Sequence, residues 1–180
     1  MASDAGPSTA PADDTIDPGL FRKTMGGFAT GVTVITVDVN GATHAMTANA
    51  FMSGSLQPPL CVISIAKRAH THGMIENAGY FGVNILGADQ ERLALYCAGK
   101  KSVDVDLRFE TVEAVPVLSD YAGRIGARVV NQFDCGDHSL FLGAILFMDA
   151  TDRAPLIYHR GAFAALAPQR LGKVPAPEFW

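Results

Sequence analysis

The stretch "RIGARVVNQFDCGDHSLFLGAILFMDA" (residues 124–150) decides the fold that the rest of the chain has to complete. Both of its halves are rich in apolar and β-branched residues, which is typical of buried β-strands. Between the halves lies Gly136-Asp137-His138, and glycine beside short polar residues favours a bend. The stretch therefore predicts two antiparallel strands joined at this bend, with two ionisable side chains, Asp137 and His138, at the bend.

Further short strands are expected on both sides of this hairpin. The segment 31–48 reads as two strands around Asn40-Gly41, a strong hairpin signal. Apolar runs at 60–65 and 80–86 predict buried strands, and residues 155–166 close the domain. The segment 49–59 contains so many small and turn-forming residues that we expect it to be irregular. Residues 100–123 are expected to be loose, anchored by Phe109, Val115 and Leu118.

Short helices are expected between the strands. Asp17 is a good N-cap for a helix that begins at Pro18. A second helix is predicted over residues 70–79, ended by Gly79. A third is predicted over residues 89–99, opened by Asp89. Many strands with few helices predict a mainly β fold with α insertions, arranged as an antiparallel barrel.

Composition and charge exclude several classes of protein. The chain has 180 residues, of which 48% are hydrophobic and 18% charged, as in an ordinary single globular domain. A net charge of −4 gives no reason to expect a nucleic acid or an anionic membrane as partner. No apolar run approaches the roughly 20 residues that span a bilayer. Because the first residues also lack the pattern of a signal peptide, we expect a cytoplasmic protein.

The ends of the chain differ in composition from its middle. Residues 1–16 are rich in Ala, Pro, Ser and Asp, and we expect a disordered tail there. One folded domain is expected over residues 17–168, followed by a proline-containing tail over residues 169–180.

The cysteine and histidine patterns argue against disulfides and metal sites. Cys61, Cys97 and Cys135 form an odd set without CxxC spacing, which fits a reducing compartment. Cys61 and Cys135 are expected to be buried in or beside strands. His70 and His72 lack a third metal ligand, so no metal is expected.

A segment rich in small polar residues follows the second strand. Small polar side chains here could hydrogen-bond a flat heterocycle, while Ala48 and Gly54 would let its ring approach the backbone. The alternative is a loop whose hydroxyls bond to nearby backbone. The polar residues concerned are Thr47, Asn49, Ser53 and Ser55.

Two further segments carry positive charge. Lys67, Arg68 and Thr71 surround the start of the second predicted helix, an arrangement that suits a phosphate but also suits a solvated turn. Near the end of the domain, Tyr158, His159 and Arg160 follow a strand. His159 or Arg160 could hold a phosphate or a ribose, or could belong to an ordinary surface cluster.

The bend of the central hairpin has two interpretations as well. In one, Asp137 and His138 are exposed turn residues. In the other, Asp137 orients the His138 imidazole over the edge of a bound ligand.

Several motifs in this order resemble the flavin reductase-like family, the reductase components of two-component flavin-dependent monooxygenases. The resemblance covers about residues 21–166. The motifs are "FATGVTVITV" (28–37), "MTANAFMSGSLQPPL" (46–60), "YFGVNIL" (80–86), "CGDHSLFLGAI" (135–145) and "PLIYHRGAF" (155–163).

The resemblance implies an FMN-binding split β-barrel and a homodimer with flavin sites near the subunit interface. It also implies an NAD(P)H-dependent flavin reductase that transfers hydride from NADH or NADPH to FMN or FAD. The reduced flavin would pass to a separate monooxygenase. Such chemistry needs stacked cofactor rings rather than a protein nucleophile, and none of the usual nucleophile motifs is present.

The resemblance also implies a role for each group of candidate residues. The flavin ring and ribityl chain would contact Thr47, Ala48, Asn49, Ser53 and Ser55. The flavin phosphate would contact Lys67, Arg68 and Thr71. Phe81 and Asn84 would lie on the strand behind the site. His138, oriented by Asp137, would face the nicotinamide as the catalytic positioning group. The rim of the pocket would be closed by Tyr158, His159 and Arg160.

Some alternatives stay open at the level of sequence. Relatives often carry Asn in place of Ala66 and small hydroxyl residues in place of Arg68, Ala69 and His70, which leaves the choice between FMN and FAD open. The choice between NADH and NADPH, the partner oxygenase and the tightness of flavin binding are also open. A split-barrel oxidase of the pyridoxamine-phosphate-oxidase type, or a non-enzymatic flavin-binding protein, would share many of these motifs.

Overall fold

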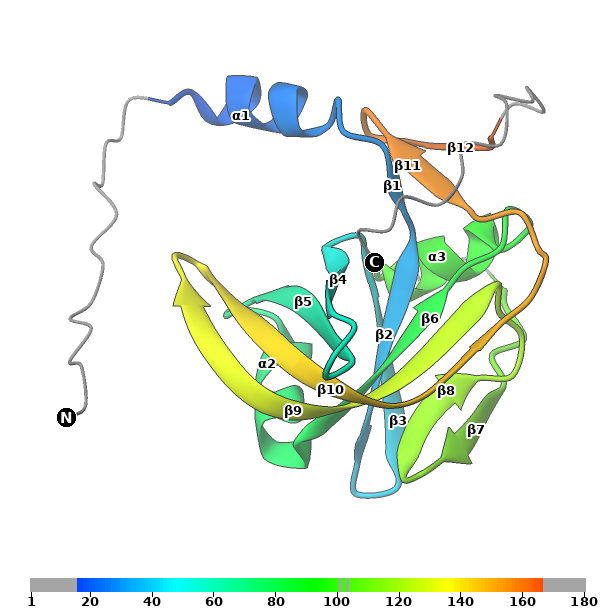
Figure 1. Cartoon of the computed structure of the whole chain (residues 1–180). Helices are drawn as coiled ribbons and strands as arrows, with labels where there is room; N and C mark the ends of the chain where they lie inside the picture. The colour runs from blue at the N-terminus through cyan, green and yellow to red at the C-terminus, as the bar shows by residue number, and fades with distance from the viewer. Residues whose placement is uncertain (1–15, 101, 103, 167–180) are drawn as a thin grey trace, which may run out of the picture.

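The computed structural model describes residues 16–100, 102 and 104–166 (Figure 1). The helices are α1 (Pro18–Met25), α2 (His70–Ala78) and α3 (Glu91–Cys97). The strands of the first half of the chain are β1 (Thr30–Gly31), β2 (Thr33–Val39), β3 (Ala42–Ala48), β4 (Phe51–Ser55), β5 (Leu60–Ala66) and β6 (Tyr80–Ile85). Those of the second half are β7 (Phe109–Val112), β8 (Val115–Leu118), β9 (Gly123–Cys135), β10 (His138–Ala150), β11 (Ile157–His159) and β12 (Ala162–Ala164).

A seven-stranded antiparallel sheet, in the order β3-β2-β6-β9-β10-β5-β4, forms the body of the molecule. Its edge strands β3 and β4 lie at opposite ends of this order, yet only residues 49 and 50 separate them in the chain. Two residues span only about 7 Å, so the two edges have to approach each other. The sheet therefore curls into a barrel that is split between β3 and β4, as predicted.

The predicted central hairpin is the longest pair of strands in the sheet. β9 and β10 pair from Cys135 and His138 at the tip to Gly123 and Ala150 at the base. The register shifts between Leu142 and Gly143 and again between Ile145 and Phe147. Such irregularities bend a strand, and β9 and β10 curve strongly in Figure 1.

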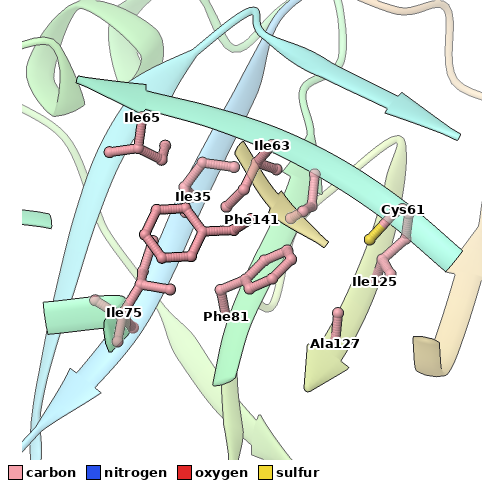
Figure 2. Close-up of a cluster of buried hydrophobic side chains, with 11 residues drawn as sticks. Ile35, Cys61, Ile63, Ile65, Ile75, Phe81, Ile125, Ala127 and Phe141 are labelled. Atoms are coloured by element: carbon pink, nitrogen blue, oxygen red, sulfur yellow. The ribbon is translucent and has the colours of Figure 1, made fainter. Parts of the chain in front are cut away.

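The main hydrophobic core lies between this curved sheet and α2. Figure 2 shows Phe81 of β6 and Phe141 of β10 in the middle of the cluster, with Ile75 of α2 beside them. All three side chains are completely buried. A second cluster includes Leu93 and Ala94 of α3 and connects that helix to the sheet. Helices α2 and α3 thus cover the barrel rather than alternate with its strands.

Several details of the predicted elements are confirmed. Asp17 caps α1, since its carboxylate accepts a hydrogen bond of 2.7 Å from the Leu20 N–H. Asn40-Gly41 forms the turn between β2 and β3, with φ angles of 55° and 81°. The helix α2 ends at Gly79, as expected.

Other predictions about the elements are wrong. The segment predicted to be irregular contains β4, because Phe51, Met52, Ser53 and Ser55 find pairing partners in β5. The segment predicted to be loose contains the β7–β8 hairpin, whose Val115 and Leu118 are buried. The N-cap of α3 is Gln90 rather than Asp89, because the Asp89 carboxylate pairs with Arg153.

The remaining predictions concern the burial of Cys135, the ends of the chain and membrane spans. Cys135 is exposed rather than buried, because it lies at the tip of the hairpin beyond the core. The predicted tails over residues 1–16 and 169–180 lie outside the described residues, except for residue 16. Within the described part of the chain, no helix is long and apolar enough to cross a bilayer.

A buried polar network joins β2, β6 and β8 beneath the barrel wall. The Asn84 side chain donates to the Val34 carbonyl at 2.8 Å and accepts from the Leu118 N–H at 2.7 Å. The Thr36 hydroxyl donates to the Pro116 carbonyl. Gly82 lies directly against this network, and a Cβ there would be 2.5 Å from the Pro116 carbonyl oxygen.

We expect Gly82→Ala to lower the free energy of unfolding by about 1–3 kcal/mol, because the added methyl group overpacks a buried wall. Urea denaturation followed by circular dichroism would measure the change. Gly73→Ala on α2 is the matched control, since a Cβ at Gly73 meets no atom within 4 Å. Equal stability of the Gly82 variant and the natural protein would contradict the packing described above.

Candidate functional site

Strand register brings three of the predicted motifs to one end of the barrel. The Ser64 N–H of β5 donates to the Ala50 carbonyl, which places the β3–β4 connection beside the end of β5. Two residues further along β5, Ala66 pairs with His138, the first residue of β10. Lys67 follows directly, and its N–H donates to the Asp137 carbonyl at 2.9 Å. We call the segment Ala48–Phe51, where the barrel is split, the seam.

The seam and the adjoining β4 present small polar side chains to solvent. Asn49 and Ser53 are exposed, and Ser55 is half-buried. Within the described residues, none of these three side chains makes a hydrogen bond or an ion pair. The pairing of β4 with β5 shifts between Ser53 and Ser55, which gives a bulge around Gly54. Bulges of this kind often occur next to functional sites, where they redirect side chains.

Two predicted threonine contacts are already used inside the protein. The Thr47 hydroxyl donates to the Ala94 carbonyl of α3 at 2.6 Å. The Thr71 hydroxyl is buried and lies 3.4 Å from the sulfur of Met46. These hydroxyls hold the helices against the barrel. Among the side chains predicted to contact the flavin ring and ribityl chain, those of Asn49, Ser53 and Ser55 therefore remain available for hydrogen bonds to a ligand.

Positive charge gathers at the turn between β5 and α2. Lys67 and Arg68 are both exposed. The Lys67 ammonium lies 3.1 Å from the Asp134 carboxylate of the hairpin, with 41% of its side chain exposed. Because this pair is open to water, Lys67 can exchange one anionic partner for another at little cost. The turn can therefore receive a phosphate group.

The Asp137–His138 pair lies at the tip of the hairpin beside this turn. Nδ1 of His138 is 2.7 Å from Oδ1 of Asp137. Because a carboxylate only accepts hydrogen bonds, Nδ1–H must be the donor, and Nε2 is left for another partner. The bond to His138 holds the pKa of the Asp137 carboxyl below its usual value, with a smaller contribution from nearby Arg68. Asp137 therefore fixes the orientation of the imidazole.

A second, buried histidine lies behind the site, and sequence reasoning did not assign it this place. Nε2 of His72 on α2 is 2.8 Å from the Ser139 hydroxyl on β10, and Nδ1 is 3.4 Å from the Glu76 carboxylate. Its ring also meets the edge of Phe141. This contact joins the helix that follows Lys67 to the residue that follows His138. His70, two residues earlier, is exposed.

Phe81 and Asn84 lie in the wall rather than at the surface. Both are completely buried on β6. Every hydrogen bond of the Asn84 amide goes to β2 or β8, as described above. Their contribution to a bound ligand would be the shape of the wall behind it.

The segment predicted to close the rim of the pocket, residues 158–160, lies outside the seven-stranded sheet. Tyr158 and His159 belong to β11, which pairs with β1 and β12 in a three-stranded sheet. Tyr158 packs edge-on against Phe163, with ring centroids 5.7 Å apart. Arg160 is exposed in the turn after β11, and its N–H donates to the Gly26 carbonyl. The structure thus groups Arg160 with the end of α1.

Cys61 is not suited to act as a nucleophile, because burial raises the pKa of its thiol to about 11. Among the described residues, no group of three or more histidine, cysteine or acidic side chains could hold a metal ion.

This end of the barrel suits a flat, phosphorylated heterocycle. Small side chains at the seam leave the backbone open to a ring, and Asn49 and Ser53 offer hydrogen bonds that the protein does not use itself. Lys67 and Arg68 lie where a phosphate chain could end, and His138 offers a positioned imidazole nitrogen. Such a site aligns ligands rather than attacks them.

Comparison with known proteins agrees with this geometry. A model of the flavin reductase like domain matches residues 25–167. The NADH-dependent flavin reductase of a Rhodococcus species is 36% identical over 157 residues, covering 86% of this chain and 89% of that protein. The reductase component of the 4-nitrophenol 4-monooxygenase/4-nitrocatechol 2-monooxygenase of Rhodococcus opacus is 32% identical over 158 residues, covering 86% and 84%.

The fold agrees as well. The structure of the flavin reductase PheA2 superposes with a TM-score of 0.82 at 44% sequence identity, covering 84% of this chain and 99% of PheA2. The overall fold is thus shared with a known flavin reductase over most of the chain. This chain belongs to the flavin reductase like domain family.

Proposed function

We propose that this protein is an NAD(P)H-dependent flavin reductase that supplies reduced FMN or FAD to a partner monooxygenase. One observation carries the proposal: the register places the seam, the Lys67-Arg68 turn and the Asp137–His138 pair at the same open end of the barrel. Of the relatives named above, one is an NADH-dependent flavin reductase and one is the reductase component of a nitrophenol monooxygenase. Family and site geometry therefore support the same activity.

The seam provides the contacts for the flavin. Ala48 and Gly54 leave room for the ring, while Asn49, Ser53 and Ser55 hydrogen-bond the ring and the ribityl chain. Lys67 and Arg68 hold the phosphate, and Thr71 contributes through its backbone N–H at the start of α2. When bound, flavin and nicotinamide supply the hydride acceptor and donor. The chain supplies the alignment.

His138 positions the nicotinamide. Asp137 fixes the ring through Nδ1, so Nε2 meets the second ligand in a single orientation. The His72–Ser139 contact holds the start of β10 against α2 and keeps His138 close to the phosphate turn. His138 is thus a positioning group and does not have to transfer a proton.

A homodimer is part of the proposal, because one copy leaves much apolar surface exposed. On and after α1, Leu20, Phe21, Met25 and Phe28 are each more than half exposed. No residue of α1 is buried. An amphipathic helix that covers nothing in its own chain is suited to pack against a second copy.

We place the reaction in the cytoplasm, where NADH is available and where the thiols of the three cysteines stay reduced.

Turnover of free flavin tests the activity. With excess FMN in air, the purified protein should oxidise many equivalents of NADH, followed by absorbance at the NADH band. Oxidation of only one equivalent of NADH would point to an oxidase, and no oxidation would point to a carrier.

The variant His138→Ala tests the role of the imidazole. We expect it to raise the KM for NADH about tenfold while the Kd for flavin changes less than twofold. An unchanged KM in the variant would refute the role given to His138.

Lys67→Gln tests the phosphate position. Loss of one charge-assisted contact of about 1.4 kcal/mol should weaken FMN binding about tenfold. Riboflavin, which has no phosphate, should bind with unchanged affinity, as measured by fluorescence titration. Lys100→Gln, at an exposed lysine outside the site, is the matched control. Equal losses for FMN and riboflavin would place the phosphate elsewhere.

The double variant Phe21→Glu/Met25→Glu tests the dimer. Two charges on the exposed face of α1 should convert a dimer into a monomer, and light scattering after gel filtration would measure the mass. Arg92→Glu on the exposed surface of α3 is the control and should stay dimeric. A monomeric natural protein, or a double variant that is still dimeric, would contradict the proposal.

A further inference from the structure

A basic groove lies between α1 and the β11–β12 turn, and no residue of the seam or of the Lys67-Arg68 turn lines it. Its volume is about 640 Å³, within the range of small-molecule sites. It is lined by Leu20, Arg22, Lys23, Thr24, Gly26, Gly27, Arg160 and Gly161. Three of these residues are cationic and none is acidic. We call this site the α1 groove.

The cations of the α1 groove are not neutralised within the described part of the chain. Arg22, Lys23 and Arg160 make no side-chain hydrogen bond and no ion pair with any described residue. Two other arginines of the surface, Arg153 and Arg124, are each paired with two carboxylates. Arg153 contacts both Asp89 and Asp120, and Arg124 contacts both Glu110 and Asp149.

The backbone around Arg160 is held in an uncommon conformation. Arg160 has φ = 50° and Gly161 has φ = 82°, the pattern of a two-residue hairpin turn that prefers Asn, Asp or Gly at both positions. The Arg160 N–H donates to the Gly26 carbonyl at 2.9 Å, which fastens the turn to the end of α1. A Cβ on Gly26 would lie 3.6 Å from the Cα of Arg160 and 2.9 Å from the Arg22 carbonyl oxygen.

This close approach gathers the cations from two distant parts of the sequence. Arg22 and Lys23 occupy the last turn of α1, while Arg160 follows a strand more than a hundred residues later. Two guanidinium groups and one ammonium group around one hollow match the geometry and the charge of phosphate oxygens.

We propose that the α1 groove binds the phosphate groups of a nucleotide or another polyphosphate. Strand β11, which Arg160 follows, pairs with β1, so the groove is supported by the three-stranded sheet on its inner side. Binding at the α1 groove does not depend on the activity proposed for the seam.

Isothermal titration of the full chain with ADP, inorganic pyrophosphate and adenosine tests this site. We expect saturable binding of ADP and pyrophosphate but not of adenosine. The double variant Arg22→Gln/Lys23→Gln should weaken both affinities at least tenfold, and Arg160→Gln should do the same. Lys100→Gln, the matched loss of one surface charge, should change them less than twofold. Circular dichroism would establish that each variant is folded.

The ratio of the two affinities identifies the source of the phosphates. Tighter binding of ADP than of pyrophosphate supports a nucleotide, and equal binding supports a polyphosphate alone. Absence of saturable binding to the natural protein, or an unchanged affinity in Arg22→Gln/Lys23→Gln, would overturn the proposal. Direct binding is measured without NADH, so failure here is distinct from failure of the reductase assay.

Discussion

The constraint on which this structure depends is the two-residue connection between β3 and β4. These strands occupy the two edges of a seven-stranded sheet, so the connection forces the sheet to curl until its edges meet. Closing a sheet in this way leaves a seam where backbone and small side chains face solvent. The predicted flavin contacts at Ala48 and Asn49 lie at this seam because the topology puts them there, and the bulge at Gly54 follows on β4.

The wall behind the seam is rigid, and the site in front of it is open. Phe81, Phe141 and Ile75 fill the space between the curved sheet and α2, while Asn84 joins three strands through buried hydrogen bonds. His72 extends this support to the start of β10 through Ser139. A reaction carried by two cofactors asks the protein for alignment more than for reactive side chains. A stiff wall under an open seam meets that need.

Some cationic side chains of the surface are paired with carboxylates, and others are available to bind an anion. Arg124 and Arg153 are each paired with two carboxylates, so their charges are already neutralised within the chain. The cations of the β5–α2 turn and of the α1 groove are open to solvent or unpaired among the described residues. The exposed apolar face of α1 lies on the same helix as Arg22 and Lys23. The proposed dimer and the proposed anion site of the α1 groove therefore both involve this helix.

The sequence by itself determined the elements whose signals are local. The β9–β10 hairpin, the Asn40-Gly41 turn, the Asp17 cap and the end of α2 at Gly79 each follow from the conformational preferences of a few adjacent residues. Motif order was enough to predict the split barrel. Tertiary structure alone decided the rest, because those features depend on partners far along the chain. β4 forms only because β5 offers it hydrogen bonds, Asp89 leaves the cap of α3 for Arg153, and Cys135 is exposed because the hairpin extends past the core. Arg160 meets Arg22 and Lys23 only when the sheet folds back on α1, and no local pattern records a contact across that distance.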